Sequence, residues 1–153
     1  MKINLECGNN VIVGYENVDS RPPADAAQRG IRNCPIGNLS FCPDGTAEEI
    51  IGIGVPNNIP LDRIEATFSH WYTKLTKGGS VYLVGNDSET LGHDLSNGYL
   101  DINTYNQAIF GTPGRTNCSL YSLHDIMEFA ARSGFSIGDR GYQGTSFYVR
   151  LYK

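Results

Sequence analysis

The sequence predicts an α/β fold, a doubly wound and mostly parallel sheet with an antiparallel hairpin at one edge. Three observations indicate it. Compact apolar runs typical of buried strands occur at 48–54 and 80–85, a helical pattern lies between them, and two alternating segments close the chain. With 153 residues, the chain is expected to form a single domain over residues 1–153.

The first two strands are expected within residues 2–19, which read KINLECGNNVIVGYENVD. A short apolar run leads into a sharp Cys7-Gly8-Asn9-Asn10 turn, and a second apolar run ends at Asp19. So little chain separates the two runs that the helix usual at this point is expected to be reduced or missing. A turn at the carboxyl end of a parallel strand presents free N–H groups, and an acid ending the next strand can accept from two ribose hydroxyls. The stretch therefore predicts a nucleoside-bearing ligand.

The middle of the chain predicts a crossover between parallel strands. A short strand is expected near 24–28, and the isoleucine-rich run at 48–54 is stopped by Pro56. Between 61 and 76 the apolar residues recur every three or four positions, which predicts an amphipathic helix ended by Gly78 and Gly79. The strand at 80–85 follows, and the order strand, helix, strand favours a right-handed crossover.

The last third combines a long polar stretch with a helix and a hairpin. Residues 86–119 are expected to form a functional connection, interrupted by a short helix over 102–110 that Asp101 caps. Ser122 and Asp125 have the spacing of a capping box, which predicts a helix that runs to Gly134. The segments 135–139 and 146–152, separated by GYQG, predict the closing antiparallel pair.

Composition excludes several classes of protein. The formal net charge of −4, without a cluster of Lys or Arg, gives no strong nucleic-acid signal. No apolar run approaches the roughly 20 residues that span a bilayer, and no export segment is recognisable, so a cytoplasmic protein is expected. The four cysteines have no CxxC spacing, which makes zinc and a disulfide framework poor interpretations, and no metal is expected.

Taken together, these segments resemble a family. KINLECGNN followed by GYENVD is similar to the K-L-N-L-G-C-G-N-N and G-W/Y-x-N-V-D of compact class I S-adenosylmethionine (SAM)-dependent methyltransferases. LSFCPDGTAEEI resembles that family's L-P-F-x-D-G-S-x-D-E-I, and WYTKLTKGGSVYLVGND resembles its helix and the strand that follows. LHDIMEFAARSGF resembles its last helix and A-G-F ending. The order and spacing of these pieces carry the resemblance over nearly the whole chain.

The resemblance implies a donor site and an acceptor. By position, the turn at Glu6, Cys7, Gly8 and Asn9 would line the methionine end of SAM, and Asp19 would take the ribose hydroxyls. The end of the fourth strand, Gly52, Ile53 and Gly54, would lie beside the sulfonium, where backbone carbonyls suit a cation. A small-molecule or glycan acceptor would enter from the 86–119 stretch, and a homodimer is left open. The short connection between the first two strands resembles the shortened versions of this fold carried by phages and viruses.

Methyl transfer needs little covalent chemistry from a protein, because the sulfonium is already a strong electrophile and alignment and desolvation provide most of the acceleration. A base is needed only if the acceptor must lose a proton. Asp87, at the end of the predicted fifth strand, is the first candidate, and His93 is the second.

Three departures from the family pattern leave other functions open. Glu6 stands where the motif has its first glycine, Gln28 or Arg29 falls where an adenine-contacting acid is expected, and Val55-Pro56-Asn57-Asn58 replaces H-x-L-E-H. A catalytically inactive relative that binds SAM or acts as an interaction module is one alternative. A SAM lyase or hydrolase is another.

Overall fold

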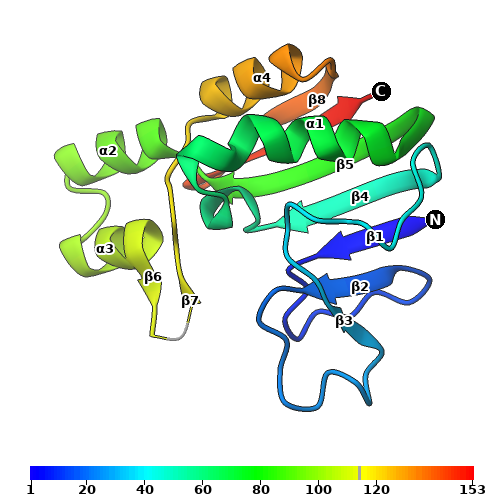
Figure 1. The fold of residues 1–153 in the computed structure, drawn as a ribbon. Coiled ribbons are helices and arrows are strands. Elements are labelled where there is room, and N and C mark those ends of the chain that lie inside the picture. Colours follow the sequence, from blue (N-terminus) through cyan, green and yellow to red (C-terminus); the bar gives the residue numbers. More distant parts are fainter. Residues whose placement is uncertain (114) are drawn as a thin grey trace.

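The computed structural model describes residues 1–113 and 115–153, and in this part of the chain seven strands form one sheet (Figure 1). Their order across the sheet is β3-β2-β1-β4-β5-β9-β8. The strands are β1 (Lys2–Leu5), β2 (Glu16–Asp19), β3 (Ile31–Asn33), β4 (Ala47–Ile53), β5 (Leu75–Asn86), β8 (Ser136–Gln143) and β9 (Ser146–Tyr152). The first five pair in parallel, whereas β9 is antiparallel to both neighbours. The predicted fold class is thus confirmed.

The strand order reverses beside β1. The chain passes from β1 outward to β2 and β3, then returns across β1 to form β4 on its other side. In an open α/β sheet, such a reversal leaves a crevice at the carboxyl ends of the two strands that flank it, because their connections leave in opposite directions. The fold therefore indicates a ligand site between the ends of β1 and β4.

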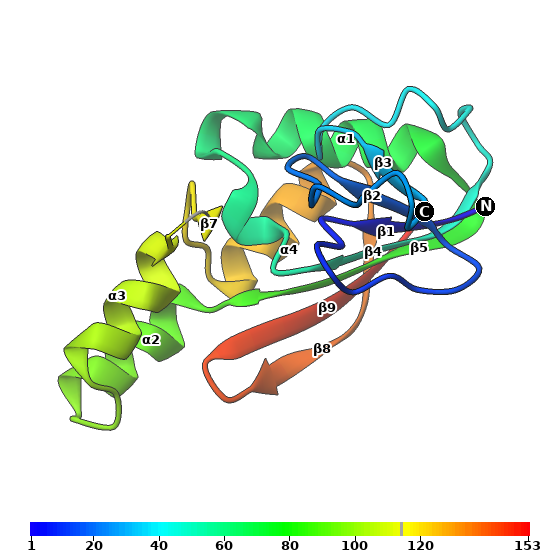
Figure 2. The same ribbon diagram turned by 90° about the horizontal axis from the view of Figure 1, so that it is seen from below.

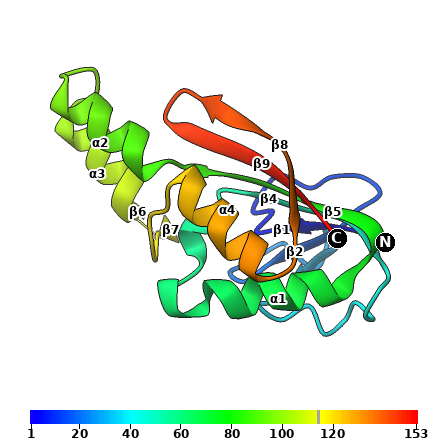
Figure 3. The same cartoon turned by 90° about the horizontal axis from the view of Figure 1, so that it is seen from above.

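Two helices cover one face of this sheet. α1 (Ile64–Lys74) and α4 (Leu123–Arg132) lie on the same side of the strands (Figure 3). Their apolar sides join the inward side chains of the central strands in one core, in which Phe68 and Trp71 of α1 and Phe147 of β9 are fully buried. Burying side chains of this size is the main favourable term in folding.

A second group of elements projects from the body as an arm. It consists of α2 (Ser88–Ser96), α3 (Ile102–Phe110), β6 (Gly111–Thr112) and β7 (Arg115–Thr116), and it extends beyond the arrowheads of the parallel strands (Figures 1 and 2). Two 3-10 helices, η1 (Pro56–Asn58) and η2 (Leu61–Arg63), connect β4 to α1. None of the helices in residues 1–113 and 115–153 is long and apolar enough to cross a membrane.

Several sequence predictions are confirmed and others are wrong. The helix over 102–110 with Asp101 as its cap is confirmed, as is the capping box of Ser122 and Asp125. The strand near 24–28 is wrong: these residues form turns, in which the Ala26 carbonyl accepts from both Arg29 and Ile31, and the strand starts only at Ile31. A preceding Pro22-Pro23 pair lacks the N–H donors that a sheet requires.

The remaining boundary errors have local causes. β5 begins at Leu75, so α1 ends before Gly78 and Gly79 rather than at them. β8 continues through most of GYQG to Gln143, which leaves Gly144 at the turn with a φ of 59°. The helix α2 was not predicted, because its sequence SETLGHDLS is polar and contains only one buried side chain, Leu91.

The connection from β1 to β2 contains no helix in residues 6–15, all of which are described, as predicted. Side chains satisfy its backbone instead. Asn17 accepts from the Ile12 N–H at 2.8 Å and donates to the Ile12 and Tyr15 carbonyls, and Asn4 donates to the Asn10 carbonyl at 2.8 Å. Because Asn4 and Asn17 are buried and also bond to each other, they fix the loop to two parallel strands.

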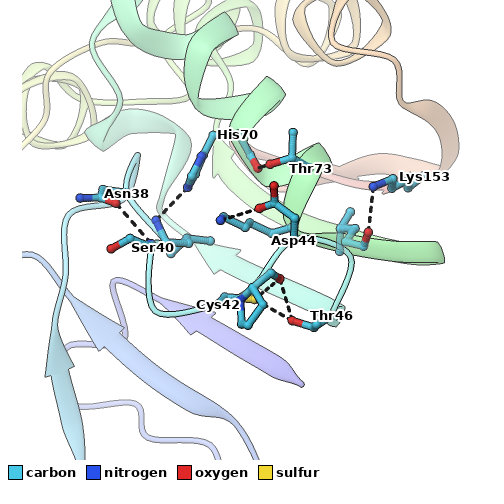
Figure 4. Close-up of polar contacts among 12 residues, drawn as sticks. Asn38, Ser40, Cys42, Asp44, Thr46, His70, Thr73 and Lys153 are labelled. Atoms are coloured by element: carbon cyan, nitrogen blue, oxygen red, sulfur yellow. Dashed lines mark hydrogen bonds and ion pairs between the residues drawn. The ribbon is translucent and has the colours of Figure 1, made fainter.

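The connection from β3 to β4 is fastened to α1 by polar contacts (Figure 4). The Leu39 N–H donates to Nε2 of His70 at 2.9 Å, and Lys74 Nζ lies 2.7 Å from the Asp44 carboxylate. Burial lowers the pKa of His70, and the charge of Lys74 lowers it further. A protonated His70 could no longer accept the Leu39 hydrogen bond.

We expect this contact to make stability fall in mild acid. Since the pKa of His70 is lower in the folded chain than in the unfolded chain, its contribution is fully present above the unfolded value near 6.5 and is lost as the pH falls through the folded pKa. Urea unfolding between pH 7.5 and pH 5 measures it. His70→Gln keeps an acceptor without a titrating group and should show a smaller pH dependence; an equal dependence in both proteins would contradict the assignment.

Candidate functional site

A cavity of about 210 Å³ opens at the point where the strand order reverses. Its walls come from segments that are far apart in the sequence: the carboxyl ends of β1, β2 and β4, the loop after β4, and the segment after β7. The lining residues are Glu6, Asp19, Arg21, Ile53, Gly54, Asn58 and Asn117. The crevice that the topology indicates is thus present, and its lining is mostly polar.

A second cavity, of about 420 Å³, adjoins the first at Asn58, which lines both. It lies between the segment that follows β3 and the segment that leads into α1. Its walls are more apolar than those of the first cavity and include Pro35, Ile36, Ile59 and Pro60. A polar cavity that meets a more apolar one suits a ligand with a hydroxyl-bearing part and a flat, weakly polar part.

Asp19 links the first cavity to the turn after β1. Its side chain is 2% exposed, and its two oxygens accept from the Gly8 N–H and the Arg21 N–H, each at 2.7 Å. These bonds hold the carboxylate at the carboxyl end of β2 beside the end of β1. An ionised carboxylate has further acceptor positions on both oxygens, so Asp19 can still take hydroxyl groups from a ligand.

Glu6 also faces this cavity. Among the described residues, it is the one non-glycine residue with a positive φ, 49°, a conformation that costs an L residue about 1–2 kcal/mol. One of its carboxylate oxygens accepts from the Ser20 N–H at 3.0 Å. Glu6 and Asp19 thus bind the consecutive N–H groups of Ser20 and Arg21, which brings the two carboxylates side by side.

The other residues predicted in the turn do not line the cavity. Cys7 is 5% exposed, and burial raises the pKa of its thiol, with the charge of Asp19 adding to the effect. Gly8 contributes through its N–H, and Asn9 is exposed and held by two hydrogen bonds from Arg29. A buried thiol with a raised pKa is a poor nucleophile, so Cys7 is not a candidate nucleophile for this cavity.

The predicted residues at the end of β4 divide into two groups. Ile53 and Gly54 line the cavity, with Ile53 62% exposed and Gly54 in a left-handed conformation at φ 74°. Gly52 points into the core instead, where an added Cβ would come within 2.9 Å of Val55 and 3.0 Å of Leu83. Gly52 therefore allows close packing behind the cavity, and it does not line it.

Asp87 and His93, the two predicted bases, lie outside the cavity lining. Asp87 is fully buried, caps α2 by accepting from the N–H and hydroxyl of Thr90, and accepts from the Leu123 N–H at 2.8 Å. It thereby ties together the first turns of α2 and α4. His93 is exposed on α2 and pairs with Asp94. The geometry does not favour either side chain as a general base.

Three lining residues, Arg21, Asn58 and Asn117, are not predicted by the sequence patterns. Arg21 follows Asp19 by two positions, and its basic side chain in a Pro-rich segment gave no recognisable signal. Asn58 belongs to the Val55–Asn58 stretch that replaces the H-x-L-E-H of the family, and this departure is a signal that could have identified it. Asn117 reaches the cavity because its side chain donates to the Ala108 carbonyl of α3, a tertiary contact that sequence does not reveal.

Residues 1–113 and 115–153 hold no group of three or more His, Cys, Asp or Glu that could bind a metal ion. Gln28 and Arg29, which fall where the family pattern has an adenine-contacting acid, precede β3 and line neither cavity. The segment after β3 contributes Pro35, Ile36 and Gly37 to the second cavity instead.

The fold is that of SAM-dependent methyltransferases of class I. A SAM-dependent methyltransferase from Thermotoga maritima superposes with a TM-score of 0.72 at 17% identity over 99% of this chain and 81% of its own. One from Mesorhizobium loti gives 0.72 at 10% identity, over 99% and 90%. A Burkholderia thailandensis 1,6-didemethyltoxoflavin N1-methyltransferase with bound 1,6-didemethyltoxoflavin and S-adenosylhomocysteine gives 0.66 at 13%, over 99% and 70%. No protein-family model and no curated protein matches the sequence.

Gly52→Ala tests the close packing behind the cavity. The new Cβ would overlap Val55 and Leu83, so we expect a loss of about 1–3 kcal/mol in the free energy of unfolding, measured by chemical denaturation. Gly92→Ala is the control: its Cβ meets nothing within 4 Å on α2, and alanine should stabilise the helix by about 0.5–1 kcal/mol. Equal effects would contradict the assignment.

Asp87→Asn tests the capping role. Asn caps helices about as well as Asp, but it leaves the buried Leu123 N–H facing an amide that has one oxygen for all three partners. We expect a loss of about 1–3 kcal/mol in unfolding free energy. Asp101→Asn, at the exposed cap of α3, should change stability little. If Asp87→Asn is as harmless as Asp101→Asn, the buried link between α2 and α4 is not important for stability.

Proposed function

We propose that this protein is a SAM-dependent methyltransferase. The observation that carries the proposal is the polar cavity at the β1/β4 reversal, in which the Asp19 carboxylate is held against the N–H of the turn after β1. The class I fold supports the same reaction, because open α/β sheets bind their ligands at this point.

We infer the following position for the donor. The ribose hydroxyls bind Asp19, and the methionine end lies along the turn formed by Glu6, Cys7, Gly8 and Asn9. The sulfonium lies beside the end of β4, at Gly52, Ile53 and Gly54, of which the last two line the cavity. The adenine occupies the adjoining cavity between Ile36 and Ile59, where apolar walls suit a flat base.

We propose that the acceptor enters the first cavity beside the base of the arm. The base of the arm forms one wall of the first cavity, since Asn117 lines it and both Asn86 and Asn117 donate to the Ala108 carbonyl of α3, at 3.0 and 2.8 Å. A small molecule or a glycan is the class of acceptor that we propose. One structural neighbour holds the small molecule 1,6-didemethyltoxoflavin together with S-adenosylhomocysteine.

The proposed chemistry requires alignment rather than acid–base catalysis. A lone pair of the acceptor attacks the methyl carbon, the C–S bond breaks, and its electron pair remains on sulfur. The protein holds the two reactants in line and excludes water from them. The surroundings of Asp87 and His93 do not favour a base from either residue, so an acceptor that is already nucleophilic fits this site best.

Titration calorimetry with SAM and S-adenosylhomocysteine tests the donor site. Asp19→Asn removes the charge that would bind two hydroxyls, and we expect it to weaken both ligands about 10- to 100-fold. Asp25→Asn, at an exposed acid in the next turn, is the matched control and should change neither affinity. Thermal unfolding of the free variants separates lost binding from lost folding. If the unaltered protein binds neither ligand, the proposed function is wrong.

A further inference from the structure

The lining of the proposed donor cavity has a net negative charge. Two of its lining side chains, Glu6 and Asp19, are acidic, and one, Arg21, is basic, so the ionisable lining sums to a formal charge of −1. Asp19 is committed on both oxygens to backbone N–H groups. Glu6 uses one oxygen for the Ser20 N–H, and no hydrogen bond to its other oxygen occurs within the described residues. Glu6 is therefore the carboxylate with the most capacity left for a ligand.

The position of Glu6 is fixed rather than free. Its backbone is held in the left-handed region, at φ 49°, and the bond to Ser20 directs its carboxylate along the end of β2 toward the cavity. Ile53 and Gly54, at the end of β4, line the same cavity. A ligand atom bound at the end of β4 is thus exposed to the negative charge of Glu6 in a partly enclosed space, where charges interact more strongly than in bulk water.

We propose that Glu6 makes this site select the charged donor over its neutral product. This inference rests on the proposed function. SAM carries a sulfonium, an ammonium and a carboxylate, for a net charge of +1, whereas S-adenosylhomocysteine has a neutral thioether and a net charge of zero. When the methyl group leaves, the pair of electrons from the C–S bond neutralises the sulfur. The negative cavity then holds the product less strongly than the donor, which favours product release.

A purely structural role for Glu6 gives a different result. If its carboxylate serves only to accept the Ser20 N–H, an amide in the same place would leave the preference for the cationic ligands unchanged, because the Gln Oε1 atom accepts the same hydrogen bond. Glu6→Gln therefore removes the charge and keeps the bond. Comparing Glu6→Gln with the unaltered protein therefore separates an effect of the charge on ligand binding from an effect on the local structure.

The experiment measures three dissociation constants by titration calorimetry at low salt. The ligands are SAM, S-adenosylhomocysteine and a donor analogue in which a protonated amine replaces the methylsulfonium. The unaltered protein should bind both cationic ligands about tenfold more tightly than the neutral product, and Glu6→Gln should reduce both preferences to about twofold or less. Glu48→Gln, at an exposed acid near the opposite end of β4, should leave both preferences unchanged.

The outcomes distinguish this inference from the function on which it rests. Binding of donor and product with equal affinity, or an unchanged preference in Glu6→Gln, overturns the role of Glu6 and leaves the methyltransferase proposal in place. Tighter binding of all three ligands by Glu6→Gly than by the unaltered protein, with the preference for the cationic ligands unchanged, would show that the side chain only obstructs the cavity, which also overturns it. Binding of no ligand by any of these proteins overturns the proposed function and this inference together.

Discussion

The missing helix between β1 and β2 is the constraint on which the candidate site depends. A helix satisfies its own backbone, whereas the loop at residues 6–15 must find partners elsewhere. Buried polar side chains provide them: Asn17 binds the backbone of Ile12, and Asp19 accepts from Gly8. Asn17 and Asp19 both lie on β2, so the same side chains that stabilise the loop also fix the end of β1 against the end of β2.

This arrangement gives the cavity its chemistry. The reversal of strand order provides the space. Asp19, which holds the shortened loop, and Glu6, at the start of that loop, provide the two carboxylates of its lining. Glu6 illustrates the connection, because its strained backbone is stabilised by a bond to Ser20 that also orients its carboxylate. The stability of the loop and the charge of the site are therefore determined by the same few residues, and a substitution such as Asp19→Asn is expected to affect both.

The sequence predicts what depends on local patterns. The apolar runs at 48–54 and 80–85, the helical spacing over 61–76 and the Ser122 capping box identified the main elements. The NVD ending identified Asp19, which lines the cavity. The sequence does not predict features whose position is determined by tertiary contacts. The polar helix α2 is stabilised by the burial of Asp87 against α4. Asn117 is held at the cavity by its bond to α3 and by the bonds of the following residues to the Asn57 carbonyl. Gly52 was assigned to the site by position, but its neighbours in the core determine its role.

The most direct test is a crystal structure of the protein grown with S-adenosylhomocysteine. We expect density for the ligand across the two cavities that meet at Asn58, with the ribose hydroxyls within hydrogen-bond distance of Asp19 and the thioether sulfur between Glu6 and the end of β4. Density at another place on the molecule, or cavities filled only by water at saturating ligand, would contradict it.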